Sequence, residues 1–321
     1  MTAPPPPDAP TLLPAPSPAP SLPPALAALV DAIVAQNPMH RGFLLRALAH
    51  TRADDRDRLE RYLRFCQARG LATDELAECY LTIVIDTLRE QIHFQRNGRY
   101  RHSTFAEVAA DVYFNDAYMS RYMIGLALTA FLWPNHLAMF RYFAEQLPTD
   151  QTGSYLEIGP GHGYYLMTAM ERSAYHAYTA IDISTTSLEL ARALVTHSGL
   201  PGRKDLTLRC EDFLTSDLDE ESFDAVVMGE VLEHVEDPDA FLARIVTVTR
   251  PGAFLFVTTC INAPAVDHIT LFPDTATIEA LFRRHTLRVR SSLICPYEGR
   301  TLEECETKRL AVNVAYVLER A

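Results

Sequence analysis

Lysines and paired cysteines are both scarce in this sequence, and each scarcity argues against a class of protein. Lys204 and Lys308 are the only lysines among 321 residues, and the formal net charge is −12. An acidic chain is poorly suited to follow a phosphate backbone, so nucleic acid is not an expected partner. The six cysteines show no C-x-x-C spacing, which favours a reducing cytoplasm over a disulfide or zinc framework. The sequence therefore predicts no metal site.

Long apolar runs and an early charged segment are also missing. No apolar stretch approaches the roughly 20 residues that a transmembrane helix needs, so we expect no membrane partner. The first basic residue is Arg41, so the N-terminus lacks the charged segment of a secretory signal peptide. Residues 1–24 contain 11 prolines and are expected to form a disordered leader, either inert or a docking peptide.

Residues 25–147 lack any strand signal and are predicted to form a helical N-terminal domain, which is also a candidate dimerisation surface. Apolar residues recur at helical spacing, as in Leu26, Leu29 and Ile33. Asp54 is expected to cap the charged helix that it begins. The helices expected after the first two cover 54–69, 73–94, 104–113, 116–132 and 134–147.

Residues 153–321 alternate strands with helices, which predicts a parallel sheet with helices on both faces. The expected strands cover 154–158, 176–181, 205–210, 224–228, 253–259, 287–294 and 311–318. The expected helices cover 162–173, 184–197, 238–249 and 275–285.

A glycine-rich stretch follows the first of these strands, and the rest of the chain is organised around it. Gly159, Gly161 and Gly163 occupy every second position, and a helical pattern begins directly afterwards. A backbone that turns tightly beside a ligand needs residues without a Cβ, and the following helix offers free N–H groups. Asp182 ends the second strand 19 residues after Gly163, where a carboxylate can bind ribose hydroxyls.

The order of these residues differs from the dinucleotide fingerprint G-x-G-x-x-G, because Glu157 precedes a G-x-G-x-G loop. This E-x-G-x-G-x-G form resembles motif I of the class I S-adenosylmethionine-dependent methyltransferases. The segment from Phe223 to Pro238 resembles the one after the fourth strand in the ubiquinone-biosynthesis-like small-molecule group. The resemblance covers about residues 153–260. It implies an α/β fold with a Rossmann-like seven-stranded sheet, in which the seventh strand is antiparallel beside the fifth.

The resemblance also implies S-adenosylmethionine as the cofactor. Glu157 would then lie near its methionine amino group, and Asp182 would bind the ribose. Asp212 would accept a hydrogen bond from the adenine amino group, with Phe213 contributing its backbone or ring. The full set of expected cofactor residues is Glu157, Gly159, Gly161, Gly163, Asp182, Ile183, Asp212, Phe213, Gly229 and Glu230.

No motif in the sequence assigns the residues that bind the methyl acceptor. Caps in this superfamily shape the acceptor pocket, and aromatic and polar residues are dense in the second half of the helical domain. Most of them are expected to pack in the core, whereas the candidates for acceptor contact are Tyr113, Tyr122, Trp133, Asn135 and His136.

Two histidines are candidate general bases, because an imidazole with an ordinary pKa can accept a hydroxyl proton near neutral pH. His268 lies in the loop after the fifth predicted strand, and its alternative role is a hydrogen bond to the backbone. His234 follows the fourth strand, and its alternative is a structural role at a helix start. Cys295 is expected to be inert.

We predict methyl transfer from S-adenosylmethionine to a small molecule. An O-methyltransferase of specialised metabolism is preferred, with carbon or nitrogen acceptors as alternatives. A nicotinamide-dependent dehydrogenase is disfavoured by the spacing of the glycine loop. A non-catalytic binding protein that recruits partners through its proline-rich leader is disfavoured by the intact motif residues.

Overall fold

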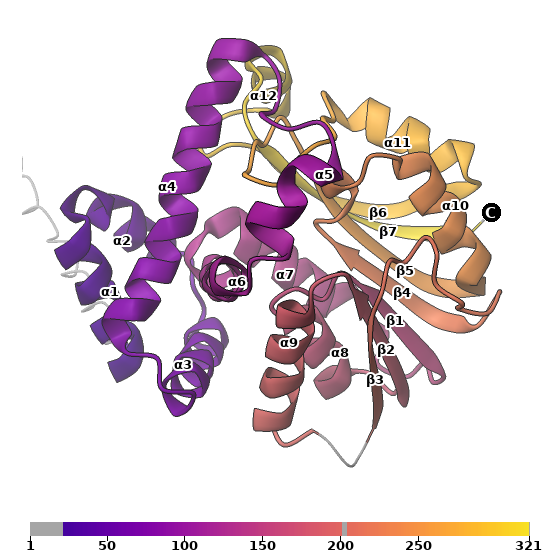
Figure 1. Ribbon diagram of the computed structural model, residues 1–321, viewed down its shortest axis with the longest axis horizontal. Helices are drawn as coiled ribbons and strands as arrows, with labels where there is room; N and C mark the ends of the chain where they lie inside the picture. Colours follow the sequence, from indigo (N-terminus) through magenta and orange to yellow (C-terminus); the bar gives the residue numbers. More distant parts are fainter. Residues whose placement is uncertain (1–21, 201–203, 321) are drawn as a thin grey trace, which may run out of the picture.

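The computed structural model of the chain describes residues 22–200 and 204–320. The leader expected over residues 1–24 lies outside this part of the chain except for its last three residues, of which Pro24 opens the first helix. Figure 1 shows a group of helices on one side of the molecule and a twisted sheet on the other.

The first group of helices, Pro24–Gln146, is called the helical cap below. It contains α1 (Pro24–Gln36), a 3₁₀ turn (Pro38–His40), α2 (Arg41–Ala49), α3 (Ala53–Ala68), α4 (Thr73–Asn97), α5 (Phe105–Val108), a π-helical turn (Ala109–Tyr113), α6 (Asp116–Leu132) and α7 (Pro134–Gln146). In the described part of the chain, no single helix is long and apolar enough to span a membrane. The bent pair of α6 and α7, which meet at 83°, meets the length and composition test together.

Two details of the cap differ from the sequence prediction. Asp54 does not cap α3: the helix begins at Ala53, and the carboxylate that accepts the hydrogen bond of the Arg52 N–H, at 2.7 Å, belongs to Asp55. The helix predicted over 104–113 changes from α to π at Ala109. That change widens the last turn, which carries Tyr113, a candidate acceptor residue.

The sheet contains seven strands in the order β3-β2-β1-β4-β5-β7-β6. The strands are β1 (Ser154–Ile158), β2 (Ala177–Asp182), β3 (Asp205–Cys210), β4 (Phe223–Gly229), β5 (Thr249–Ile261), β6 (Leu287–Cys295) and β7 (Val312–Arg320). All neighbouring pairs are parallel except that β7 is antiparallel to both β5 and β6. The predicted sheet and its antiparallel last strand are therefore confirmed.

The two faces of the sheet are buried by different elements, because successive side chains of a strand point to opposite sides. One face, with Tyr155 and Phe256, shares a core with the helical cap. The other, with Leu156 and Val226, packs on helices within residues 232–308. The remaining elements are α8 (Tyr164–Arg172), α9 (Thr185–His197), a 3₁₀ turn (Leu232–His234), α10 (Pro238–Val248), α11 (Thr275–Arg284) and α12 (Leu302–Lys308).

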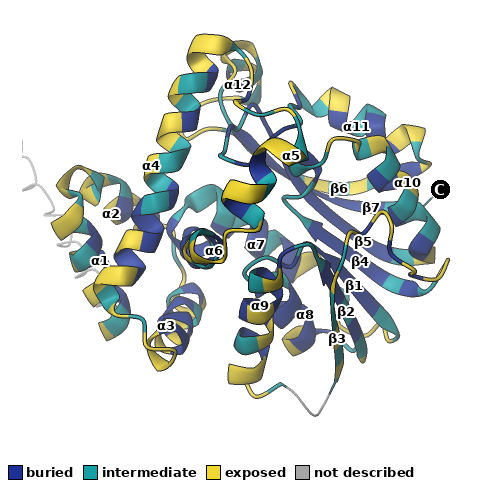
Figure 2. Ribbon diagram, in the orientation of Figure 1, coloured by how far each residue is buried: buried dark blue, intermediate teal, exposed yellow. Residues whose placement is uncertain are grey.

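The cap is not a separate globule, because its residues continue the core of the sheet. Phe143 of α7 is fully buried, with its ring centroid 4.8 Å from that of Tyr165 and 5.0 Å from that of Phe256. Figure 2 shows the resulting continuous buried zone between the cap and the strands. The cap is thus fixed directly over one face of the sheet.

Phe143→Ala is expected to lower the free energy of unfolding by about 3–5 kcal/mol, because it leaves a cavity between α7 and β5. The matched control is Phe114→Ala, since the Phe114 side chain is 61% exposed, and its effect should stay within about 0.5 kcal/mol. Urea unfolding followed by circular dichroism measures both. Equal stability of the two variants would mean that the cap does not pack on the sheet in this way.

Candidate functional site

The glycine-rich loop leaves the carboxyl end of β1 and requires glycine at each of its three positions. Gly159, Gly161 and Gly163 have φ values of +65°, +49° and +81°. A Cβ at Gly163 would lie 2.8 Å from the Ala191 Cα, so this position also brings α8 close to α9. A Cβ at Gly161 would lie 3.2 Å from the sulfur of Met123 on α6. The loop is therefore tight, and the helical cap lies directly over it.

Asp182 ends β2 beside this loop, where the sequence places it. Its carboxylate accepts a hydrogen bond from the backbone N–H of Ser184 at 2.8 Å. Burial raises the pKa of Asp182 to about 6, and backbone N–H groups of Ser184, Gly161 and Ile183 counteract part of this rise. A carboxylate held in this way can accept hydrogen bonds from the two hydroxyls of a ribose.

Glu157 lies beneath the loop and is almost fully buried. Its carboxylate accepts a hydrogen bond from the Tyr155 hydroxyl at 2.6 Å. Burial raises the pKa of Glu157 to about 8, although the hydrogen bonds from Tyr155 and from the Leu166 N–H favour the charged form. These contacts support the start of α8, and a cationic amino group nearby would restore the charge of Glu157.

Of the two residues expected at the adenine, Asp212 is exposed and Phe213 is buried. Asp212 is exposed after β3, and one of its carboxylate oxygens accepts a hydrogen bond from the Leu214 N–H at 2.9 Å. The Phe213 ring is buried against Phe241, with the ring centroids 5.2 Å apart. Because that ring belongs to the core on the far side of the sheet, only the backbone of Phe213 remains available to a cofactor.

Four side chains gather where β4 and β5 end, and we call Glu230, Glu233, His234 and His268 the carboxylate–histidine cluster. The Gly229 position before it is tight, since a Cβ there would lie 2.8 Å from the Tyr165 ring. Glu230 has a positive φ of +52° and accepts a hydrogen bond from Asn313 at 3.2 Å.

The two carboxylates of this cluster are incompletely satisfied. Glu233 accepts a hydrogen bond from the Thr259 hydroxyl at 2.7 Å. Within the described residues, the Oε1 atoms of Glu230 and Glu233 are buried without a hydrogen-bond partner. Burial raises the pKa of both carboxyls, and the neighbouring Glu230 raises that of Glu233 further. Buried carboxylate oxygens without donors are costly unless a proton shared between the two carboxyls or a bound cation satisfies them.

Within the described residues, the hydrogen bonds of His234 and His268 involve Nδ1, and the Nε2 atom of neither ring is engaged. His268 Nδ1 lies 2.6 Å from the Ala263 carbonyl oxygen and His234 Nδ1 lies 3.1 Å from the Asp267 carbonyl oxygen, so each N–H donates to a carbonyl. Their rings are 4.6 Å apart and perpendicular. Burial lowers the pKa of His268 to about 3, which favours the neutral ring and makes it a weak proton acceptor. The hydrogen bond to Ala263 is the backbone contact expected as the alternative role of His268.

This cluster is suited to hold a divalent cation. One ligand atom each of Glu233, His234 and His268 lies within 4.8 Å of the others, and Glu230 and Cys260 adjoin Glu233 in a second group of the same size. Imidazoles whose Nδ1 is bound to a carbonyl, together with carboxylates, form a common donor set for first-row transition metals. The sequence prediction of no metal rested on cysteine spacing and did not consider this combination.

Asp267 connects the cluster to the helical cap. Its carboxylate is buried and accepts hydrogen bonds from the Tyr113 and Tyr122 hydroxyls, each at 3.2 Å. One of its oxygens also lies 3.4 Å from His234 Nδ1, and the Tyr113 hydroxyl lies 3.0 Å from the same nitrogen. The two tyrosines predicted at the acceptor therefore reach the cluster through a shared carboxylate.

The other three candidate acceptor residues have different surroundings. Asn135 donates to Asn313 at 2.6 Å, and the same Asn313 donates to Glu230, so this residue also reaches the cluster. Trp133 instead donates its indole N–H to Tyr80 within the cap, at 3.1 Å. His136 Nδ1 lies 2.9 Å from the hydroxyl oxygen of Thr129, and burial lowers its pKa to about 4. The polar groups of these two residues are thus engaged inside the cap.

The sequence prediction omitted Glu233 and Asp267. Glu230, Glu233 and His234 are spaced i, i+3 and i+4, and Asp267 directly precedes His268. The first spacing places side chains on one side of a helical turn, and this signal is available from the sequence. Convergence on Asp267 is not available in that way, because Tyr113 and Tyr122 are more than a hundred positions distant in the sequence.

Comparison with known proteins identifies the sheet domain. A family model described as a methyltransferase domain matches residues 156–257. The chain has a class I methyltransferase domain. This match supports S-adenosylmethionine, the cofactor predicted from the sequence.

Two curated relatives and one solved structure illustrate what this domain is similar to. The ubiquinone biosynthesis O-methyltransferase of Chromobacterium violaceum is 34% identical over 107 residues, which cover 32% of this chain and 43% of that protein. The protein of the same name from Paracidovorax citrulli is 32% identical over 160 residues, which cover 49% of this chain and 63% of that protein. The chain spans about half the length of these curated relatives. The solved structure of mitomycin 7-O-methyltransferase MmcR shares the fold, with 16% identity, a TM-score of 0.53 and coverage of 78% of this chain and 70% of that one.

Asp182→Asn is expected to weaken the binding of S-adenosylhomocysteine to the methyltransferase domain by about 10- to 100-fold, because the ribose loses a charged acceptor. Isothermal titration calorimetry measures the change. Asp205→Asn, exposed at the opposite end of the adjacent strand, is the control and should bind normally. Equal affinities in both folded variants would place the ribose elsewhere.

The affinity of the wild type for S-adenosylhomocysteine should fall as the pH falls below about 6. The pKa of Asp182 is raised to about 6, and the ribose hydroxyls bind its deprotonated form. Below that pKa binding must release a proton, which costs up to about tenfold in affinity per pH unit. Titrations between pH 7 and 5 should show this fall for the wild type and a flatter profile for Asp182→Asn. A steeper profile in the variant would contradict the assignment.

Proposed function

We propose that the protein transfers the methyl group of S-adenosylmethionine to a hydroxyl of a small molecule and that a divalent cation at the carboxylate–histidine cluster assists. The observation that carries this proposal is the pair of buried Oε1 atoms of Glu230 and Glu233, which have no hydrogen-bond partner within the described residues. Ligand atoms of Glu233, His234 and His268 lie within 4.8 Å of one another at the same place. The names of the curated relatives, ubiquinone biosynthesis O-methyltransferases, favour oxygen over nitrogen or carbon as the acceptor atom.

The position of the cluster supports this function. In the sheet, β1 pairs with β4, and β4 pairs with β5, all in parallel. The glycine loop, the turn with Glu233 and His234, and the loop with His268 therefore leave the same edge of the sheet side by side. Ligands of open parallel sheets bind at this edge, where the strand order reverses. An acceptor held at the cluster would lie next to the cofactor.

The chemistry divides between the cofactor, the cation and the protein. The sulfonium of the cofactor supplies the electrophile, so the protein mainly aligns donor and acceptor and excludes water. A divalent cation lowers the pKa of a hydroxyl that it binds, which favours the nucleophilic form near neutral pH. Glu230, Glu233, His234 and His268 would hold the cation. Asp267 would keep the His234 N–H directed away from it.

The helical cap would shape the acceptor pocket. Tyr113 and Tyr122 bring aromatic rings from the π-helical turn and α6 to Asp267, next to the cluster. Met123 of the same helix lies against the glycine loop. Apolar walls of this kind suit an aromatic acceptor such as a phenol or catechol of specialised metabolism, and they would exclude water from the sulfonium.

The test is a panel of phenols, catechols, carboxylic acids and amines incubated with the purified chain and S-adenosylmethionine. The protein is first stripped with a chelator, and Mg²⁺, Mn²⁺ or Zn²⁺ is then restored. Mass spectrometry locates the transferred methyl group. We expect an O-methylated phenolic product whose formation depends on the added cation. Products methylated only on nitrogen, or rates that a chelator leaves unchanged, would contradict the proposal.

His268→Ala is expected to lower the affinity for Mn²⁺ by at least about tenfold, because it removes one nitrogen ligand. Calorimetry without substrate measures this, and affinity for S-adenosylhomocysteine should remain within a few-fold of wild type. His285→Ala is the matched control, since His285 pairs with Asp239 on the surface. Unchanged Mn²⁺ binding in the folded His268 variant would remove His268 from the cation site.

A further inference from the structure

The imidazole of His162, in the glycine-rich loop, has one of its two nitrogens fixed by the backbone. Its Nδ1 accepts a hydrogen bond from the Tyr164 N–H at 3.1 Å, at the start of α8. A backbone N–H can only donate, so in the neutral ring of His162 the proton lies on Nε2. Among residues 22–200 and 204–320, nothing accepts a hydrogen bond from this Nε2–H, and the ring is only partly buried. A donor in the cofactor loop is therefore available to a ligand.

This ring is neutral near pH 7. Burial lowers the pKa of His162 to about 4. Burial and, to a lesser degree, the neighbouring His162 lower the pKa of His136 on α7 to about 4. The two rings therefore lie near each other between the loop and α7. The Nε2–H of His162 is a neutral donor whose protonation does not change between pH 6 and pH 8.

Two helix starts at this point favour negative charge. α8 begins at Tyr164, directly after the loop. α7 begins at Pro134 with no side-chain cap, so the N–H groups of Asn135 and His136 in its first turn receive no capping acceptor. The N-terminal end of a helix carries partial positive charge. Together with the donor on His162, these helix starts suit an anionic group of a ligand better than a cationic one.

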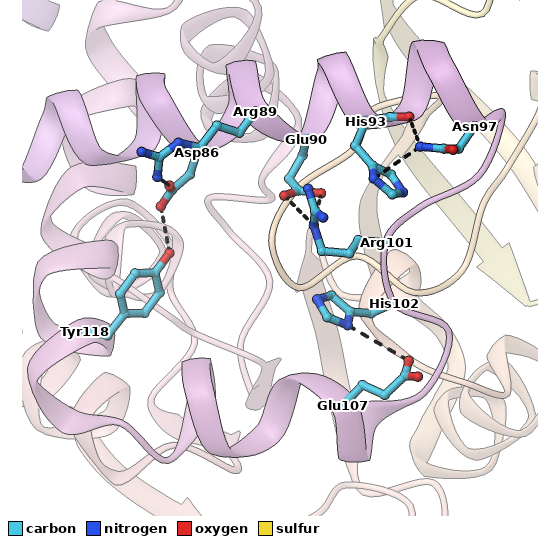
Figure 3. A network of polar contacts seen from close by, with 9 residues as sticks. All are labelled: Asp86, Arg89, Glu90, His93, Asn97, Arg101, His102, Glu107 and Tyr118. Atoms are coloured by element: carbon cyan, nitrogen blue, oxygen red, sulfur yellow. Dashed lines mark hydrogen bonds and ion pairs between the residues drawn. The ribbon is translucent and has the colours of Figure 1, made fainter.

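The cap side of this place is held by contacts within the protein. Met123 of α6 lies against Gly161, the residue before His162. On the same helix, the Tyr118 hydroxyl donates to Asp86 of α4 at 2.9 Å, as Figure 3 shows. A group that binds between the loop and the cap thus meets surroundings that are already ordered, which lowers the entropic cost of binding.

We propose that the Nε2–H of His162 binds the carboxylate of the methionine part of S-adenosylmethionine. That part of the cofactor carries an ammonium group and a carboxylate on the same carbon atom. Glu157, buried beneath the loop, offers negative charge to the ammonium group. The carboxylate is then left to donors on the cap side of the loop, where His162 lies. This inference depends on the cofactor alone, and neither the acceptor nor the cation enters it.

Calorimetry with S-adenosylhomocysteine and with its decarboxylated analogue, which keeps the amino group, tests the proposal without acceptor or cation. The wild type should bind S-adenosylhomocysteine about 10- to 100-fold more tightly than the analogue. His162→Asn keeps an acceptor for the Tyr164 N–H but has no N–H at the position of Nε2. It should lose about 10- to 100-fold in affinity for S-adenosylhomocysteine and bind the analogue as the wild type does.

His162→Gln is the matched variant, because its amide nitrogen reaches the position of Nε2, and it should keep most of the preference for S-adenosylhomocysteine. His176→Ala, exposed just before β2 at the opposite end of the sheet, is the control and should bind both ligands normally. Equal weakening of both ligands in His162→Asn would mean that His162 only shapes the loop. That result, a wild type without preference, or unchanged affinities in the folded Asn variant would overturn the proposal.

Discussion

The buried carboxylate of Asp267 is the interaction on which the organisation of the site depends. It lies in the loop after β5, yet two of its hydrogen-bond donors, Tyr113 and Tyr122, come from the helical cap. An isolated charge at this depth would be costly, so the cap must be seated for Asp267 to be satisfied. Because the same residue faces His234, the position of the cap and the orientation of the histidine are linked.

In the proposed reaction the glycine loop after β1 binds the cofactor, and the carboxylate–histidine cluster after β4 and β5 binds the acceptor. Asp182 and the loop offer backbone and carboxylate groups to a nucleoside. Glu230 and Glu233 place two carboxyl groups with buried oxygens at one point, where electrostatic interactions are strong. A cation there would balance a pair of carboxylates that otherwise repel each other. The proposed function rests on this electrostatic need more than on any similarity.

Most of the methyltransferase domain could be predicted from the sequence, because its signals are local. Alternating strands and helices, and glycines whose positive φ values are needed in the turn, are encoded within a few residues of each other. Predictions at element ends were weaker. The side chain that caps the N-terminus of α3 was predicted to be Asp54 instead of Asp55. Both acidic residues fit the pattern, and only the backbone geometry separates them.

The sequence by itself determined the sheet, the cofactor loop and the acidic residue at the end of β2. These depend on the strand period, on the absence of a Cβ and on the position of Asp182 along the chain. Only the tertiary structure decided which cap residues reach the site. Tyr113 and Tyr122 converge on Asp267, while Trp133 is bound to Tyr80 inside the cap. The physical reason is that such contacts join residues distant in sequence, whose approach is set by packing of the whole core.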